Sequence, residues 1–472
     1  MKILSTLIFT FTIAVIVPTN TNAKQFPDLG SDSRNALSIS DEKFIGEALM
    51  QQLRAANAVC ADPIINSYLN NLGHKLLIHA DIKHFNFIFF GLEDHSINAF
   101  AALGGYIGIN KGLILATQNE NELAAAIAHE ISHVSQEHIV RSIMKNKQFL
   151  PVTLAGALAS VVLGAPELGI SILATHQQRM FNANRAYEKE ADNIAMQLLA
   201  DAGFDPQSMS TLFKRMEKQA QYNTDAPEFL STHPRFETRV SEADPRANRF
   251  NYRQRPSSFN YYLIKAIIEN SFHNDKAEFI AEIKERLAKQ RYENKDATLY
   301  GYALVLAANN ELTSAHNVLQ ELATNHSNNL IIQLGLVDVK IAQQQRQQAT
   351  TKMAELLTIF PDDVALILKY AENLIAKKEI SEAKTWLLKL TKRKNPEPLI
   401  YQLLAQAESI VGNNIGTHTA TAELNVLYGD LEHALTQFDM ALELSKNNPS
   451  LKTTIEKRKL EIENMVIRRE SL

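Results

Sequence analysis

The sequence predicts an α+β protein that is mostly α-helical, in which a domain with a small β-sheet precedes an α-solenoid. Three observations support this fold class. The run from Leu123 to Val134 contains no proline or glycine, which favours an uninterrupted helix. Ile107 and Ile109 alternate with small or polar residues, as they would along a strand. From about residue 297 onward, small and apolar residues recur with the period of a helical repeat.

The N-terminus has the pattern of a cleavable export signal. Lys2 precedes an uncharged apolar run that ends at Val17, and a stretch of small and polar residues ends at Ala23. We therefore expect a signal peptide over residues 1–23. No cysteine follows the run directly, so attachment of a lipid is not expected.

Composition limits the kinds of partner and of covalent chemistry. The chain has 48 lysine and arginine residues against 52 aspartate and glutamate residues. This balance gives no electrostatic basis for binding nucleic acid, and we expect no nucleic-acid partner. Cys60 is the one cysteine, so no internal disulfide can form. Its apolar neighbours indicate a small core residue and not a reactive thiol.

The segment from Ser96 to Leu115 is expected to form a strand, a bend and a second strand. Gly104 and Gly105 permit the bend and the close approach of another backbone. A plain hairpin is an interpretation that the residues by themselves leave open.

The segment HEISH at residues 129–133 places two imidazoles one helical turn apart. Positions i and i+4 share a helix face, so both rings can bind one zinc ion while Glu130 reaches a bound water. Asn119 is placed to cap this helix, with Glu122 three residues later as in a capping box. The alternative is a core helix that carries two histidines without a metal.

A catalytic zinc site needs a third protein ligand, and the acidic segment at residues 188–192 supplies one. Glu188 and Asp192 lie four residues apart at the start of a helical pattern, so they share a face. Glu188 can complete a His, His, Glu ligand set, and Asp192 can hydrogen-bond a ligand imidazole. Glu190 points elsewhere and is expected to be solvated. Without the histidines, this segment would be an ordinary acidic helix surface.

Three further polar residues lie outside these two motifs. His233 precedes Pro234, which favours an extended loop. It is expected either to bind the metal as a fourth ligand or to donate to the developing oxyanion. Arg239 can serve the same region, or it can be a structural arginine. His138 falls on a different helix face from His133 and is expected to be structural.

An uncharged segment at residues 149–166 lies between the two ligand motifs. Pro151 and two glycines interrupt it, and its length is marginal for a membrane span, which needs about 20 apolar residues. We expect buried packing. A lid, or peripheral contact with a membrane or a client protein, is the alternative.

The C-terminal part has the period of tetratricopeptide repeats, which is about 34 residues. One series is Ala315, Ala349 and Ala383, and another is Ala303, Val337 and Ala371. We expect a repeat domain over residues 297–472, a helical bridge over 255–296 and a catalytic domain over 24–254. Stacked helix pairs form a concave surface that binds partners. A generic helical bundle is the alternative.

Four segments together resemble the gluzincin peptidases that include the HtpX and CAAX prenyl proteases. They are SINAFAALGGYIGINKGLI at 96–114, HEISH at 129–133, EKEAD at 188–192 and STHPRFETR at 231–239. Within this family, the chain is most similar to soluble periplasmic members with a repeat domain after the catalytic domain. The resemblance covers essentially the whole mature chain. It implies a gluzincin-type metalloprotease domain followed by an α-solenoid of tetratricopeptide repeats.

The resemblance also implies the roles of the site residues. It assigns one zinc ion per chain to His129, His133 and Glu188, makes Glu130 the general base, and gives Asp192 the role of supporting a ligand. The chemistry needs these residue types, because zinc lowers the pKa of water and polarises the scissile carbonyl while a base takes the water's proton.

The function implied is that of a periplasmic zinc endopeptidase that is also a chaperone, in quality control and assembly of outer-membrane β-barrel proteins. Its expected partners are unfolded or misassembled outer-membrane proteins, and the barrel-assembly machinery through the repeat domain. An extended substrate is expected to add beside the strand within residues 96–115. The alternative is a non-proteolytic scaffold with a structural metal site. Glu130 favours the enzyme, because a structural site is closed by four ligands and needs no base.

Overall fold

The computed structural model describes residues 37–80, 86–145, 185–222, 229, 233, 236–250 and 255–470. The expected signal peptide at 1–23 and the uncharged segment at 149–166 lie outside these residues. Within the described residues, no helix combines the length and the apolar character that crossing a bilayer requires.

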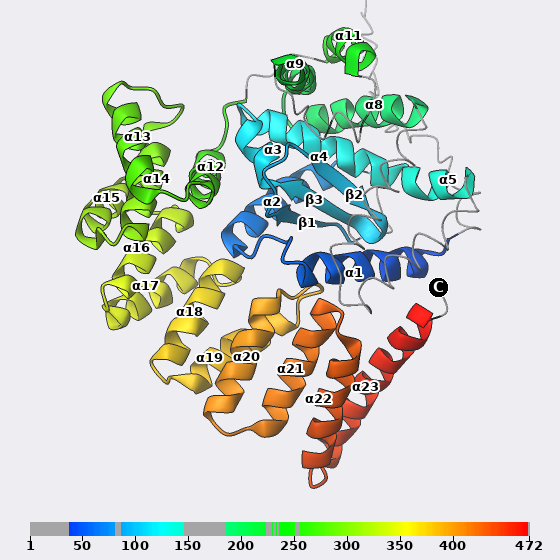
Figure 1. The fold of residues 1–472 in the computed structure, drawn as a ribbon, viewed down its shortest axis with the longest axis vertical. Helices are drawn as coiled ribbons and strands as arrows, with labels where there is room; N and C mark the ends of the chain where they lie inside the picture. The colour runs from blue at the N-terminus through cyan, green and yellow to red at the C-terminus, as the bar shows by residue number, and fades with distance from the viewer. Residues whose placement is uncertain are drawn as a thin grey trace, which may run out of the picture.

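The first part of the chain packs helices around a three-stranded sheet (Figure 1). Its elements are α1 (Ile39–Ala55), α2 (Pro63–Leu77), β1 (Ile88–Leu92), β2 (Ala99–Ala102), the 3₁₀ turn η2 (Leu103–Gly105), β3 (Tyr106–Asn110), α3 (Lys111–Ala116), α4 (Glu120–Ser135), α5 (His138–Lys145), α8 (Arg185–Asp201), α9 (Gln207–Tyr222) and α11 (Phe236–Ala247). Together with the helical C-terminal part, this confirms the predicted α+β, mostly α-helical fold class.

The predicted strand, bend and strand correspond to β2, η2 and β3. Gly104 and Gly105 have φ angles of 78° and 86°, which favour glycine. A Cβ on Gly104 would lie 3.1 Å from the main-chain oxygen of Glu42, so α1 is the backbone that approaches. β3 pairs in parallel with β1 and antiparallel with β2. Because both edges of β3 are paired, the expectation that a substrate adds beside this strand is wrong for β3.

The helix predicted from its lack of proline and glycine is α4, which is buried from Glu120 to Val134. Asn119 caps it, because its side-chain oxygen accepts from the main-chain N–H of Glu122 at 3.1 Å. The second half of the predicted capping box is wrong. The Glu122 carboxylate accepts instead from the N–H of Gln118 at 2.8 Å, so it satisfies the residue before the cap.

The second part is a stack of helices joined by short turns. Its elements are α12 (Phe259–Phe272), α13 (Lys276–Ala288), α14 (Lys295–Ala308), α15 (Leu312–Asn325), α16 (Leu330–Ala342), α17 (Arg346–Ile359), α18 (Val364–Ala376), α19 (Ile380–Thr391), α20 (Pro398–Ile410), α21 (Asn414–Tyr428), α22 (Leu431–Leu444) and α23 (Pro449–Glu470). The two predicted series of repeating residues, which start at Ala303 and Ala315, are completely buried from α14 to α19. The structure therefore follows the predicted helix-pair register.

A backbone feature repeats in the same register. The turns inside successive helix pairs hold left-handed residues at Asn310, Gln344, Lys378 and Gly412, with φ angles of 62°, 63°, 66° and 72°. Only the last is glycine, so three of these turns place a side chain in a conformation that L-residues rarely adopt. The sequence pattern of small residues did not reveal these positions.

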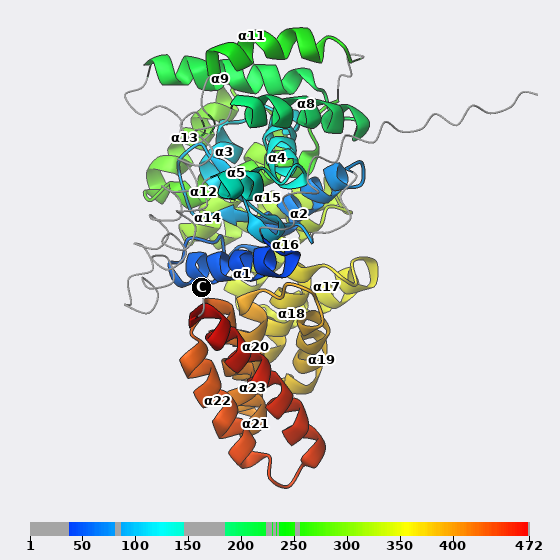
Figure 2. The same ribbon diagram turned by 90° about the vertical axis from the view of Figure 1, so that its right-hand side faces the viewer.

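The repeat helices curve around one side of the first part, and α23 returns beside α1 (Figures 1 and 2). α2 packs against α12 and α18, and α1 packs against α21. The inner side of the arc, predicted to bind partners, therefore contacts the first part of the same chain. A single hydrophobic core also runs from Cys60 to Val339. The predicted boundary at residue 297 thus falls within continuous packing, and the domain limits stay predictions.

Candidate metal centre

The centre is built on α4. His129 and His133 lie one turn apart, both are fully buried, and their Nε2 atoms are 3.0 Å apart. This is the arrangement expected from the spacing of four residues on a helix.

α8 packs along α4 and brings two carboxylates to these histidines. Glu188 Oε2 lies 3.4 Å from His129 Nε2, and Glu188 Oε1 lies 3.4 Å from His133 Nε2. Asp192, one turn further along α8, places Oδ1 3.1 Å from His129 Nδ1. The two acids share one face of α8 and contact opposite nitrogens of the same imidazole.

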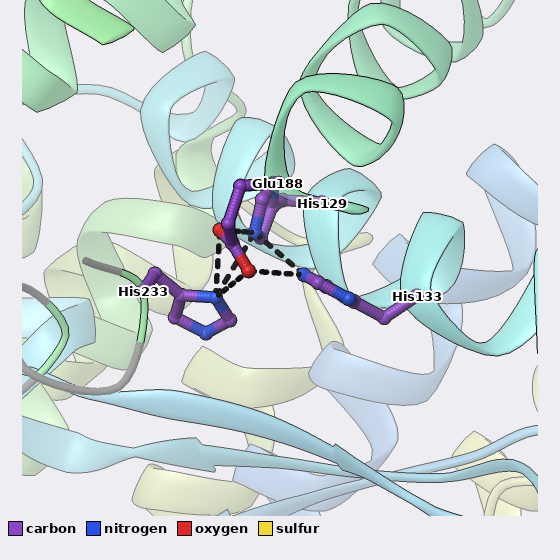
Figure 3. Close-up of side chains that lie close together, drawn as sticks. All are labelled: His129, His133, Glu188 and His233. Carbon is purple, nitrogen blue, oxygen red and sulfur yellow. Dashed lines mark hydrogen bonds and ion pairs between the residues drawn. The ribbon is translucent and has the colours of Figure 1, made fainter. Parts of the chain in front are cut away.

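His233 joins the group from the segment that precedes α11. Its Nδ1 lies 3.2 Å from His129 Nε2 and 3.2 Å from Glu188 Oε2. Figure 3 shows His129, His133, Glu188 and His233 pointing toward one another. One ligand atom from each of the four lies within 4.8 Å of the other three. The predicted loop histidine is therefore at the centre.

The donor set fits a divalent metal ion. Ligand atoms around a tetrahedral zinc ion with bonds of about 2.0–2.1 Å lie roughly 3.3 Å apart. His129 lies 3.0 Å, 3.2 Å and 3.4 Å from the other three donors, and Glu188 lies 3.4 Å from His133 and 3.2 Å from His233. Imidazole nitrogens and a carboxylate oxygen are also ligand types that zinc takes. The four side chains can therefore hold one metal ion.

Arg239 of α11 contacts the centre on the Nδ1 side of His129, where Asp192 lies. Its Nη2 and Nε donate to the two oxygens of Asp192 at 2.6 Å and 2.9 Å. Its Nη1 lies 3.1 Å from Glu188 Oε2 and donates to the main-chain oxygen of His233 at 3.2 Å. One guanidinium thus contacts both carboxylates and the segment that carries the loop histidine.

Burial and neighbouring charges set the protonation of the cluster. Burial lowers the pKa of His133 well below its usual value, so this imidazole is uncharged at neutral pH. Burial would raise the pKa of Glu188, but the charges of His233 and Arg239 outweigh it and hold that pKa well below its usual value. Burial would lower the pKa of His233, but the carboxylates of Glu188 and Glu130 raise it to about 10.

Glu130 lies beside the four donors and is 1% exposed. Among the described residues, its Oε1 meets no hydrogen-bond donor in good geometry, and His233 Nε2 lies 3.3 Å away. A buried carboxylate oxygen is costly unless something pairs with it. The position suits an oxygen that accepts a proton from a water or substrate at the centre.

One prediction about the surroundings of the centre is wrong, and another is incomplete. His138 is not on another face of the same helix, because α4 ends before it and α5 begins there. Its Nδ1 lies 2.9 Å from His133 Nδ1. Glu190 is partly solvated, with 25% of its side chain exposed, but its carboxylate also lies 3.2 Å from His138 Nε2 and 3.1 Å from Arg141. The helix breaks at Glu137, whose φ is 51°, and no glycine or asparagine marks that turn in the sequence.

Comparison with known proteins relates the chain to metallopeptidases. Residues 63–247 match peptidase family M48, and residues 340–407 match the tetratricopeptide repeat. The chain is 31% identical over 447 residues to the Beta-barrel assembly-enhancing protease of Escherichia coli (strain K12), covering 93% of this chain and 92% of that protein. The namesake from Yersinia pestis is 31% identical over 415 residues, which are 87% of this chain and 85% of the relative.

A more distant similarity covers a shorter part of the chain. The Mitochondrial metalloendopeptidase OMA1 of Schizosaccharomyces pombe is 30% identical over 158 residues, which are 32% of this chain and 44% of that protein. The M48 match includes every residue of the centre from His129 to Arg239.

We expect the purified chain to hold one metal ion, and the double variant His129→Ala, His133→Ala to lose it, because two of the four donors are removed. Metal analysis after gel filtration measures the content. An unchanged metal content in the double variant would contradict the assignment of these two histidines as metal ligands.

Metal binding should also weaken as the pH falls from about 8 to about 6. Burial would lower the pKa of His129, but hydrogen bonds with Asp192 and Glu188 raise it, and the pKa of His233 is raised to about 10. Protons therefore compete for these nitrogens near neutral pH, and uptake of metal should release protons. Titration calorimetry in buffers of different ionisation enthalpy measures this release, and an affinity independent of pH would contradict it.

Proposed function

Since the chain belongs to peptidase family M48, we propose that its metal ion is zinc, held by His129, His133 and Glu188. The chain is a metalloendopeptidase with C-terminal tetratricopeptide repeats. The observation that carries the proposal is the convergence of three imidazoles and a carboxylate on one buried point beside Glu130. Attack of water on a peptide bond needs a Lewis acid and a base, and this arrangement offers both.

Each residue of the proposed site has a separate role. Zinc, when bound, lowers the pKa of a water molecule and polarises the scissile carbonyl. Glu130 takes the proton of the attacking water and delivers it to the leaving amine. Asp192 accepts the Nδ1 proton of His129, so that the Nε2 lone pair faces the metal. Arg239 holds Asp192 through two hydrogen bonds. No covalent nucleophile is needed, and Cys60 is buried in the core.

His233 is proposed to restrain the site. As a fourth protein ligand it would fill the position that a catalytic zinc keeps open for water. Movement of its segment would open that position and expose Glu130 to the water. A transition-state donor is the other role compatible with its place, since Nε2 faces the same carboxylate.

A structural metal site in a non-proteolytic scaffold is the second candidate function. The observation in its favour is the set of four protein donors, which is typical of closed structural sites. Glu130 argues against it, because a buried carboxylate beside a structural metal costs stability and has no task there.

Extended substrates are proposed to bind along β2. This strand packs against α4, and within the described residues β3 is its one sheet neighbour. An added strand would pair with main-chain groups and would not depend on side-chain identity. This mode favours unfolded chains, which can present an extended segment.

We propose that the protein works in the periplasm on unfolded or misassembled outer-membrane β-barrel proteins, with a chaperone activity beside proteolysis. The support is the expected signal peptide and the relatives named as beta-barrel assembly-enhancing proteases. The barrel-assembly machinery is the proposed partner of the repeats. Since the inner side of the arc contacts the catalytic part, the exposed apolar side chains Ile359, Leu388 and Leu444 are the proposed contact points.

Replacing Glu130 with glutamine should leave zinc content and fold intact and reduce peptide hydrolysis by roughly a hundredfold or more, because the amide cannot accept the water's proton. Hydrolysis of an unfolded substrate such as casein, with zinc content measured on the same sample, tests this. A variant that cleaves casein at the wild-type rate would show that the proposed mechanism is incorrect.

Replacing His233 with alanine should leave zinc content nearly unchanged, since three ligands stay, and should alter the proteolytic rate. A rise, with or without self-cleavage, identifies a blocking ligand, and a fall identifies a transition-state donor. The rate on casein measures the sign. An unchanged rate would assign this imidazole a structural role alone.

A photo-crosslinking residue at Leu388 or Ile359 should capture the barrel-assembly machinery in living bacteria, whereas one at Ile78 on the catalytic part should not. Ile78 is 79% exposed, against 46% for Leu388 and 63% for Ile359, so accessibility alone would favour the control. Equal capture at all three positions would count against a docking surface on the repeats.

A further inference from the structure

The two ligand imidazoles on α4 are supported differently. Nδ1 of His129 faces a carboxylate directly, because Asp192 Oδ1 lies 3.1 Å away. Nδ1 of His133 faces another imidazole, because His138 Nδ1 lies 2.9 Å away. His138 is fully buried and is not among the grouped donors. It contacts a proposed ligand without being one.

A carboxylate lies behind His138. Nε2 of His138 is 3.2 Å from Oε2 of Glu190, and Nη1 of Arg141 donates to the same oxygen at 3.1 Å. His129 has a similar arrangement, because Asp192 contacts its Nδ1 and Arg239 donates to that aspartate. Each ligand imidazole is therefore backed by a carboxylate that an arginine holds, and the His133 side has one extra imidazole between them.

A metal ion bound at Nε2 of His133 would determine which nitrogen carries each proton along these contacts. His133 presents Nε2 to the other donors, so this nitrogen must be unprotonated in a metal complex, and Nδ1 carries the hydrogen. That N–H donates to Nδ1 of His138, which is then the acceptor. His138 consequently carries its own proton on Nε2 and donates it to Glu190. Every donor in this chain of groups faces an acceptor.

Packing fixes the plane of the His138 ring. The imidazole stacks on Tyr187 with ring centroids 4.5 Å apart and 13° between the planes. The guanidinium of Arg141 lies 4.4 Å from the centre of the same Tyr187 ring. The left-handed turn at Glu137 directs the start of α5 back toward His133. A histidine that served packing alone would not need an acceptor aligned with a ligand nitrogen.

We propose that His138 is a positioning residue of the metal site, which accepts the Nδ1 proton of His133, links that ligand to Glu190 and so fixes its tautomer and orientation. The inference rests on the proposed function, because it takes His133 as a metal ligand. Loss of such a partner typically weakens metal binding or activity by about 10- to 100-fold.

Two variants separate the acceptor from the packing. His138→Phe keeps a ring against Tyr187 but has no acceptor, whereas His138→Asn places an amide oxygen near the position of Nδ1. We expect the phenylalanine variant to bind zinc about tenfold more weakly or worse, and the asparagine variant to lie closer to wild type. Competition with a chromophoric chelator measures the affinity.

The control is His74→Phe, at an exposed histidine. His74 packs against Phe89 and bonds to the main-chain oxygen of Asn70, so its replacement removes an imidazole from the same part of the chain but from outside the centre. This variant should bind zinc as wild type does. A loss equal to that of His138→Phe would assign the effect to general destabilisation and overturn the proposal.

Two spectroscopic readouts respond to ligand orientation. With cobalt(II) in place of zinc, the visible absorption bands of His138→Phe should differ from those of wild type. In zinc-loaded wild-type protein labelled with ¹⁵N-histidine, NMR should show His138 protonated on Nε2 and bare on Nδ1. The NMR measurement needs no variant, so it decides the matter even where a substitution prevents folding.

Failure of this inference is distinguishable from failure of the proposed function. Wild-type zinc affinity in His133→Ala would overturn the ligand assignment itself. If zinc binding requires His133, but His138→Phe keeps wild-type affinity and cobalt bands, the positioning role is wrong and the metal site stands. A proton on Nδ1 of His138 in the zinc-loaded protein would overturn it equally.

Discussion

The packing of α8 along α4 is the interaction on which the centre depends, because it brings two carboxylates against two buried imidazoles. An ion moved out of water into a protein costs on the order of several kcal/mol, so Glu188 and Asp192 need partners in the interior. Arg239 supplies charge to both of them. The buried carboxylates, the imidazoles and Arg239 therefore stabilise one another only when all are present. Loss of one of them leaves an uncompensated buried charge. The same completeness gives each ligand a single orientation.

α1 links this catalytic part to the repeats. One face of α1 meets the bend between β2 and β3, where Gly104 lets the two backbones approach. Elsewhere on α1, Gln51 donates to the main-chain oxygen of Val426 at 2.8 Å, and Phe44 lies under the guanidinium of Arg468 at 4.6 Å. Since the hydrophobic core also continues through α16, the repeats belong to the same packed body. A partner that displaced α23 or α21 would remove contacts of α1, and α1 also touches the bend next to β2.

How far the sequence predicts this structure depends on whether a feature is local. The spacing of His129 and His133 determines a shared helix face whatever the rest of the fold, and the period of about 34 residues determines helix pairs in the same way. The central place of β3 depends on parallel pairing with β1, which no local pattern encodes. The contact of His138 with the centre depends on the turn at Glu137, and a glutamate does not signal a left-handed turn. Glu190 is linked to the centre through its contact with His138, so both contacts were missed for the same reason.

Arg239 ties the orientation of the proposed ligand His129 to the position of the loop histidine. It holds Asp192, which orients His129, and it also donates to the main-chain oxygen of His233. If the segment of His233 moves away to admit water, that hydrogen bond is lost while the bidentate pair with Asp192 can stay. The two functions of the arginine are thus separable by geometry, because the main-chain contact uses Nη1 and the aspartate contacts use Nε and Nη2. A site arranged in this way would let the proposed ligand His233 leave while the other three proposed ligands stay fixed.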